Sequence, residues 1–468
     1  MKTIAISIQM WYNNRVQLCR TDAKRLHTNI FPAHALPEMR KERFYDDRLR
    51  TDPARRGHRL LRDSGSEIQD QYVENLFQPA ALGCHCCRKR PRHLPLDGEQ
   101  PALPLHCTAP EKAPDALRRS IFGSVQREGD IQTNHISATV IDDRYALEQE
   151  PLFDEVLELL LDCLFRPNAA DGAFSQTEFR IRQQNLLDTI KAEIDEKRTY
   201  ALNQARRTAF DGEPAALSPC GTAEEVAALT PASAYAAYQE LLRTAGIEIY
   251  FVGPAKKAGL ADKLRRAFAA IPDRKPQPLC AIAPSPAKPE PQEVHELLPV
   301  AQCKLVLLWK TAYENPWVLA MLSAVFGGTP SSKLFANVRE KMSLCYYCAA
   351  SYSTFKQSLT VDSGIEQQNV EKTRDAILQQ LREIQQGNIT QEELENAKMS
   401  FHDSIYGIGD TPSSYINWYF GQFCKGISLS QDELHEKYQS VTIPQLVEAA
   451  NTLTLDTIYL MDCKKEAE

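Results

Sequence analysis

The feature that most limits what this chain can fold into is an order of strand and helix signals that occurs twice along it. In each copy a strand pattern precedes amphipathic helices, a polar residue opens a long helix, and a second strand closes the copy. Two copies of one α+β unit of about 200 residues explain this order, and a unit of that length excludes a solenoid of short repeats. The matching segments of the two copies are 133–141 and 304–309, 174–178 and 388–393, and 247–252 and 456–461.

Proline residues and helix-capping residues predict where the two units and their helices begin and end. The stretch 272–298 is rich in Pro and Ala, and Pro disfavours both helices and central strands, so this stretch predicts an interdomain linker. We therefore expect a first unit over 121–271 and a second over 299–468. Within the first unit, Ser175 and Glu178 have the spacing of a capping box, which predicts a long helix running to about Phe210.

Residues 1–120 differ in character from the rest of the chain. Arg, His, Pro and Cys crowd this segment, and neither helical nor strand periodicity is clear. We hypothesise that residues 31–120 are read in a shifted frame, so that the segment folds poorly; resequencing that finds an intact frame would contradict this. The Cys and His residues at 84–93 do not have the spacing of a zinc site, because the adjacent thiols of Cys86 and Cys87 do not easily bind one tetrahedral ion.

Composition excludes several classes of partner. A net charge of −7 disfavours nucleic acid, and 43% hydrophobic with 25% charged residues is ordinary for a soluble globular protein. The apolar run 3–11 is too short to span a bilayer and lacks the organisation of a signal peptide. The thirteen cysteines show no repeated spacing, which favours free thiols in a reducing compartment over a disulfide scaffold. We expect a cytoplasmic protein without nucleic-acid or membrane partners.

Three stretches, in order, carry a family resemblance: Leu186–Tyr200, Phe210–Gly253 and Phe326–Tyr346. Together they resemble the insulinase, pitrilysin and mitochondrial processing peptidase family of zinc metallopeptidases, in its short two-domain bacterial form and closest to its non-catalytic members. The likeness covers about residues 122–465. It implies two homologous α/β-sandwich units, with helices on one face of a mostly antiparallel sheet, arranged as a clamshell around a chamber.

The zinc site of active relatives is absent from the sequence. Active members carry His-x-x-Glu-His, in which two imidazoles on one helix face reach the zinc ion and the Glu polarises the attacking water. No two of the ten histidines here are four residues apart. The position that matches the family's third ligand is Thr189, and a Thr hydroxyl is a poor zinc ligand. Two separate losses predict an inactive chain with no catalytic residue, no zinc ligand and no cofactor.

Two residues match substrate-facing positions of the family's second domain, Arg339 and Tyr346. A Tyr hydroxyl donates to a carbonyl oxygen, and a guanidinium holds peptide carbonyls or a terminal carboxylate. The alternative is a surface Arg and a Tyr in the core. Cys345 lies between these two residues in the sequence, and Cys348 follows Tyr346. The two cysteines form a C-x-x-C spacing within a strand pattern, which favours buried thiols over a redox motif at a helix start.

The resemblance predicts a non-catalytic subunit that holds a peptide or pairs with an active zinc peptidase homologue. We expect a hetero-oligomer such as a heterodimer, by analogy with mitochondrial processing peptidase, or else a homodimer. Two other functions stay open: an active zinc endopeptidase with unrecognised ligands, which tightly bound stoichiometric zinc would favour, and a scaffold in a protein-modification pathway. Arg339 and Tyr346 argue against the scaffold, which would have no peptide substrate.

Overall fold

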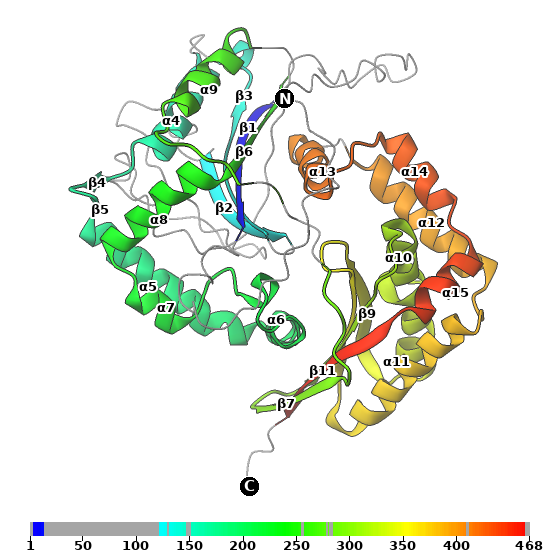
Figure 1. The fold of residues 1–468 in the computed structure, drawn as a ribbon. Coiled ribbons are helices and arrows are strands. Elements are labelled where there is room, and N and C mark those ends of the chain that lie inside the picture. Colours follow the sequence, from blue (N-terminus) through cyan, green and yellow to red (C-terminus); the bar gives the residue numbers. More distant parts are fainter. Residues whose placement is uncertain are drawn as a thin grey trace.

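A computed structural model describes residues 3–13, residues 121–253 without 129–130 and 147–150, and residues 257–463 without 278, 280–283 and 409–410 (Figure 1). The shifted-frame hypothesis for 31–120 and the Cys and His residues of 84–93 therefore lie outside the described residues. No helix of the described residues is long and apolar enough to cross a membrane.

The first sheet has four antiparallel strands, and its N-terminal strand is central. β1 places Ile4, Ile6 and Ile8, all at most 1% exposed, in the first core, and the intervening Ser7 and Gln9 are buried as well, as expected for a central strand. Residues 3–13 thus belong to the first unit, although the sequence boundary at 121 left them out; their partner strands are more than a hundred residues away, so no local signal placed them. In spatial order the strands are β2 (Ile121–Glu128), β3 (Ile131–Ile141), β1 (Thr3–Asn13) and β6 (Gly246–Val252).

The helices of the first unit follow the predicted order, with two local differences. Thr222 and Thr230 form capping boxes, but the Ser175 side chain makes no cap bond, and Glu178 instead accepts from Asn168 Nδ2 at 2.8 Å. The long helix predicted up to Phe210 is interrupted by a 3₁₀ turn at Glu193–Asp195. The helices are α4 (Leu152–Phe165), α5 (Gln176–Ala192), α6 (Lys197–Ala209), α7 (Ala223–Ala228), α8 (Pro231–Thr244) and α9 (Leu260–Ala269).

The second sheet repeats the strand order of the first. Its order β11-β8-β10-β9 corresponds to β6-β1-β3-β2, so β8 is the counterpart of β1 and β10 is the counterpart of β3. The match of 133–141 with 304–309 is therefore wrong, because the counterpart of 304–309 lies at the N-terminus of the chain. One further strand, β7, runs parallel to β11 at the edge, so the last seven residues of the predicted linker 272–298 are part of this sheet. The strands are β7 (Gln292–Leu298), β11 (Thr454–Cys463), β8 (Cys303–Lys310), β10 (Ser358–Ile365) and β9 (Cys345–Ser353).

Helices cover one face of the second sheet and enclose a second core. Trp309, Leu319 and Phe326 are among its buried side chains, at 2% exposure or less. α10 continues into a π-helical segment, η5 (Ala324–Gly328), and a second π-helical segment, η6 (Leu334–Lys341), follows after an extended residue at Thr329. The α-helices are α10 (Pro316–Ser323), α11 (Val370–Gln385), α12 (Gln391–Tyr406), α13 (Pro412–Lys425), α14 (Gln431–Gln439) and α15 (Ile443–Asn451).

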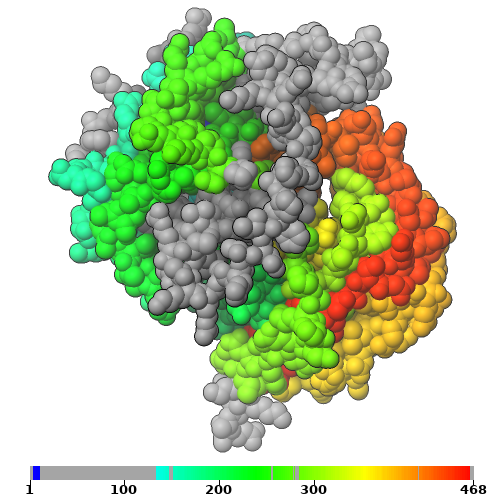
Figure 2. Space-filling model, viewed as in Figure 1, coloured from blue at the N-terminus to red at the C-terminus, as the bar shows by residue number. Residues whose placement is uncertain are grey.

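The two units exchange one helix each. α6 of the first unit packs on β8 and β11 of the second sheet, where Ala201 and Ala205 contact Tyr459. α13 of the second unit enters the first core, where the ring of Phe420 lies 6.3 Å from that of Tyr250 in an edge-to-face arrangement. In Figure 1, α6 lies beside the second sheet and α13 beside the first, and Figure 2 shows the two units side by side. Helices therefore cover both faces of the second sheet.

Candidate functional site

The face of the second sheet that meets α6 contains both apolar side chains and polar contacts between the units. Along β8, Leu305, Leu307 and Trp309 point to the helical core, and the intervening Val306 and Leu308 contact the first unit. This alternation follows from the two-residue period of a strand. The α6 side of the sheet is thus the place where side chains of both units meet.

An arginine of α6 binds an aspartate of β10 across the units. Arg198 Nε and Nη2 lie 2.5 and 3.1 Å from the two carboxylate oxygens of Asp362, a bidentate pairing. The guanidinium also lies 4.6 Å from the ring centre of Tyr347. The hydrogen bond to Asp362 raises the pKa of Arg198, and burial raises the pKa of Tyr347.

A second polar contact is centred on a fully buried carboxylate. Asp456, at the start of β11, has no exposed surface, and its carboxylate lies 2.9 Å from Lys288 Nζ and 3.1 Å from Lys310 Nζ. Burial favours the protonated acid, but hydrogen bonds from Lys288, Thr457 and Lys310 hold the pKa of Asp456 below its ordinary value. Lys310 Nζ also donates to the carbonyl of Ala209 in α6 at 2.7 Å, which ties this network to the first unit.

Between α6 and strands β8, β10 and β9 of the second sheet lies a cavity of about 320 Å³. Arg206 lines it and donates to the carbonyls of Ala215 and Leu217 at 3.1 and 3.5 Å, and burial lowers its pKa to about 10. Lys356 lies opposite, 2.5 Å from Glu213 Oε2. Hydroxyls complete the polar lining, which suits backbone carbonyls or a carboxylate; they are those of Ser351, Ser353, Ser358 and Thr360.

The sequence-predicted pair Arg339 and Tyr346 does not line the cavity: Arg339 lies on η6, and Tyr346 lies near the start of β9, the strand whose other end lines it. Tyr346 occupies a β-bulge opposite the Gly364–Ile365 step, is 58% exposed, and donates to Glu366 Oε1 at 3.1 Å. The core position considered for this Tyr is therefore wrong. Glu366 raises the pKa of Tyr346 through that hydrogen bond.

Arg339 lies on η6, close to the beginning of β9. Its guanidinium lies 4.5 Å from the ring centre of Phe335 and 3.6 Å from Glu340 Oε1, with the side chain 39% exposed. The pKa of the neighbouring Cys345 is lowered to about 7, chiefly by a hydrogen bond with Cys348, with smaller contributions that include the charge of Arg339. Arg339 and Tyr346 thus lie on either side of Cys345, both accessible to a ligand.

Thr189, at the family's third-ligand position, has its hydroxyl engaged within its own helix. The Oγ1 atom donates to the carbonyl of Asn185 in α5 at 3.0 Å. Among the described residues, one set of three His, Cys, Asp or Glu side chains has ligand atoms within 4.8 Å of one another, and it lies on the second sheet, not on α5: Cys303, Asp462 and Cys463.

Sequence reasoning missed the residues that the fold brings together from distant parts of the chain. Arg198 and Asp362 are 164 positions apart, and Cys303 and Cys463 are 160 apart, so no motif spacing relates them. A weak signal existed in the alternation of β10, where Asp362 interrupts an apolar strand. A charged residue at such a position predicts a buried partner without saying which one.

Comparisons with known proteins agree with the resemblance. Residues 228–401 match the family model described as the peptidase M16 inactive domain. The probable inactive metalloprotease YmfF of Bacillus subtilis (strain 168) is 24% identical over 346 residues, which are 73% of this chain and 81% of that protein.

Solved structures share the fold over most of the chain. A conserved protein from Enterococcus faecalis V583 superposes with a TM-score of 0.73 at 21% identity, covering 100% of this chain and 95% of that one. A peptidase M16 inactive domain from Pseudomonas fluorescens gives a TM-score of 0.59 at 16% identity, covering 74% and 82%. With no His-x-x-Glu-His pattern and with Thr189 at the third-ligand position, the chain is similar to inactive members of the insulinase-type, or M16, peptidase family.

Proposed function

We infer that this chain is a peptide-holding partner subunit that works beside an active zinc peptidase homologue. One contrast carries the proposal: the third-ligand position holds a Thr whose hydroxyl is engaged in its own helix, whereas Tyr346 in the second unit is 58% exposed. The chemistry of cleavage is lost, and the accessible peptide-contact positions remain. In this proposal the two units form a clamshell in the cytoplasm, and the partner supplies the zinc.

The cavity beside α6 supports the peptide-holding part of the proposal. Its volume of about 320 Å³ lies within the range of about 300–1,000 Å³ typical of ligand pockets. Arg206 donates to backbone carbonyls and, among the described residues, makes no carboxylate hydrogen bond, so its guanidinium has donors to offer a peptide. Arg339 and Tyr346 would extend the contact along the neighbouring strand.

The test compares this chain alone with this chain mixed with an active family member from the same genome. We expect no peptide hydrolysis by the chain alone, with or without added zinc, and a gain in hydrolysis when it joins the active homologue. Zinc-dependent hydrolysis by the chain alone would overturn the proposal and favour the active endopeptidase.

Two variants test whether the gain in hydrolysis depends on the proposed peptide contacts. Tyr346→Phe and Arg339→Gln each remove donors, and we expect the gain in hydrolysis to fall roughly 10-fold, as for loss of a hydrogen bond to a charged or polarised group. Tyr145→Phe and Arg265→Gln are matched controls, because both residues are exposed in the first unit, at 48% for Tyr145 and 76% for the Arg265 side chain. If all four variants behave alike, Arg339 and Tyr346 do not contact the peptide.

A further inference from the structure

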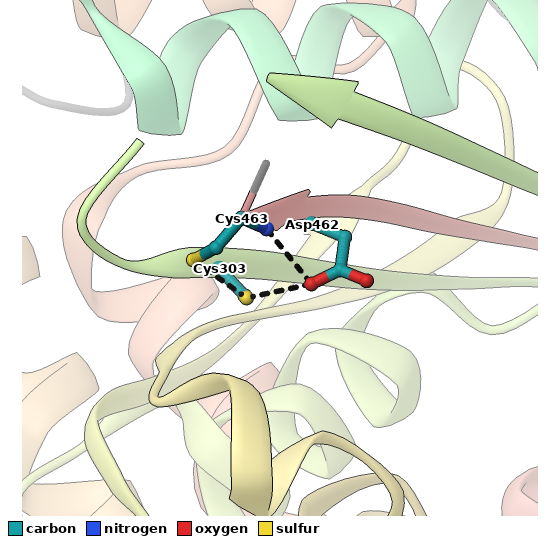
Figure 3. Close-up of side chains that lie close together, drawn as sticks. All are labelled: Cys303, Asp462 and Cys463. Atoms are coloured by element: carbon teal, nitrogen blue, oxygen red, sulfur yellow. Dashed lines mark hydrogen bonds between the residues drawn. The ribbon is translucent and has the colours of Figure 1, made fainter. Parts of the chain in front are cut away.

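Two thiols and a carboxylate converge where β8 begins and β11 ends (Figure 3). The sulfurs of Cys303 and Cys463 lie 3.1 Å apart, and the Cys303 thiol donates to Asp462 Oδ1 at 3.2 Å. The three possible ligand atoms all lie within 4.8 Å of one another. Thiolate and carboxylate oxygen are the ligands that zinc and similar divalent ions take in proteins.

The carboxylate is held in place by three other donors. His295 Nε2 on β7 lies 2.8 Å from Asp462 Oδ2, and Gln367 Nε2 lies 2.9 Å from Oδ1. The backbone N–H of Cys463 also donates to Oδ1, at 2.8 Å. Outer contacts of this kind orient a metal-binding carboxylate in protein metal sites, and a solvated surface Asp does not need them.

An ion has a route to this group. Asp462 and His295 line a cavity of about 310 Å³ between β7, β11 and α11. Cys303 is fully buried, while Asp462 and Cys463 are half-buried, so the group is enclosed on one side and accessible on the other. Three protein ligands with one open position match a four-coordinate site that keeps a water or a small ligand.

We propose that Cys303, Cys463 and Asp462 bind one thiophilic divalent cation of the zinc type. On binding, each thiol releases its proton to water and forms a sulfur–metal bond, and Asp462 Oδ1 exchanges the Cys303 hydrogen bond for a bond to the metal. With metal–sulfur bonds of about 2.3 Å in tetrahedral geometry the sulfurs stand roughly 3.7 Å apart, which a small rotation of half-buried Cys463 supplies. The ion joins the end of β11 to the start of β8.

This site differs from the zinc site of active M16 peptidases in position and ligand type. It lies on the second sheet and uses thiolates, whereas the active members' site is built from two His and a Glu. It therefore neither needs nor implies peptide hydrolysis, and its test is independent of the proposed partner function.

The experiment titrates reduced, metal-free full-length chain with Co²⁺, because thiolate-to-cobalt charge-transfer absorption reports sulfur ligands directly. We expect one Co²⁺ per chain with this absorption, displaced by one equivalent of Zn²⁺. Cys463→Ser and Cys303→Ser should each abolish or sharply reduce the charge-transfer band. His295→Gln should retain the band and weaken the affinity roughly 10- to 100-fold, as expected for a group that only orients a ligand.

Controls separate this site from other thiols. Cys220→Ser should leave the absorption unchanged, as should serine substitution of Cys84, Cys86 and Cys87 together. Half-buried Cys463 keeps the test valid if the buried Cys303→Ser variant fails to fold. Full absorption in Cys463→Ser, no stoichiometric binding by the unmodified chain, or a disulfide between Cys303 and Cys463 that persists under the reducing conditions of the titration would each overturn the proposal.

Discussion

Asp456 carries a negative charge at a point with no solvent exposure, and two lysines make that possible. Lys288 and Lys310 both contact its carboxylate, and the Lys310 side chain is only 4% exposed. Removing one member of a buried ion pair leaves the other charge without water or a partner. This contact links strand β11 to the residues before β7, so its loss affects the whole second sheet.

Asp456→Asn is expected to destabilise the protein by about 3 kcal/mol, because Lys310 then keeps its buried charge without a carboxylate. Urea denaturation at pH 7 measures the change. Asp375→Asn is the control, since Asp375 is 73% exposed and its substitution should change the free energy of unfolding by less than about 0.5 kcal/mol. Equal effects of the two variants would show that Asp456 is not structurally important.

His135 makes stability depend on pH. Burial lowers its pKa from 6.5 to about 4, so the unfolded chain binds a proton below pH 6.5 that the folded chain does not take up until about pH 4. The contribution of His135 to the free energy of unfolding therefore falls as the pH drops from 6.5 to 4. The loss is about 3 kcal/mol, at 1.36 kcal/mol per pKa unit. Unfolding free energies at pH 7 and pH 4.5 measure it. His135→Gln should remove this part of the pH dependence, and an unchanged profile would contradict the assignment.

At the scale of elements, α6 relies on small side chains to approach the second sheet. Ala201 and Ala205 are 1% exposed and contact Val306, Tyr459 and Met461. A larger side chain at this contact has no free volume, because packed interiors lack voids of that size. The alanines therefore set the distance between the helix and the sheet.

Ala205→Leu should destabilise the protein by about 1–3 kcal/mol through overpacking. Hydrogen exchange should show loss of protection in α6 and in the facing parts of β8 and β11. Ala236→Leu, on the exposed side of α8, inserts the same side chain without such an effect. A neutral Ala205→Leu would mean that α6 is loosely docked.

Elements whose signals are local were predicted well. The strands at 133–141, 247–252 and 304–309, and the capped helix start at Thr390, depend on residues within four positions of one another, and the structure confirms them. The placement of β1 and of α6 depends on partners far along the chain. Alternation shows that a face is buried but not what covers it. The predicted Arg339 and Tyr346 came from family resemblance, whereas Asp362 gave only a weak local signal that did not identify Arg198 as its partner.

At the scale of the whole molecule, the exchanged helices couple the two units. Ile416, Phe420 and Cys424 of α13 are at most 5% exposed within the first core, although the sequence assigns them to the second unit. The first core contains side chains of both units, and two smaller clusters join α6 and the residues after it to the second sheet, so the first core is not complete without the second unit. We expect one cooperative unfolding transition.

Phe420→Ala tests this coupling. It should cost about 3–5 kcal/mol, as for deletion of a buried aromatic ring, and should lower hydrogen-exchange protection in β6 of the first unit. The matched change Phe326→Ala removes a ring from the second core. One unfolding transition in both variants is the expected result, and two separate transitions would show that the units fold independently.

The exchange of α6 and α13 also indicates one way in which such a chain could arise. In a domain-swapped homodimer, equivalent helices each pack on the opposite copy of the same unit. Fusion of two gene copies that encode such a dimer would give a single chain with this arrangement. In such a fusion the Pro-rich residues between the copies would lie where the two polypeptides join, and the unfused protein would be a symmetric dimer. Once fused, the copies were free to diverge, so that one half could lose its chemistry while the other kept the shape that both need.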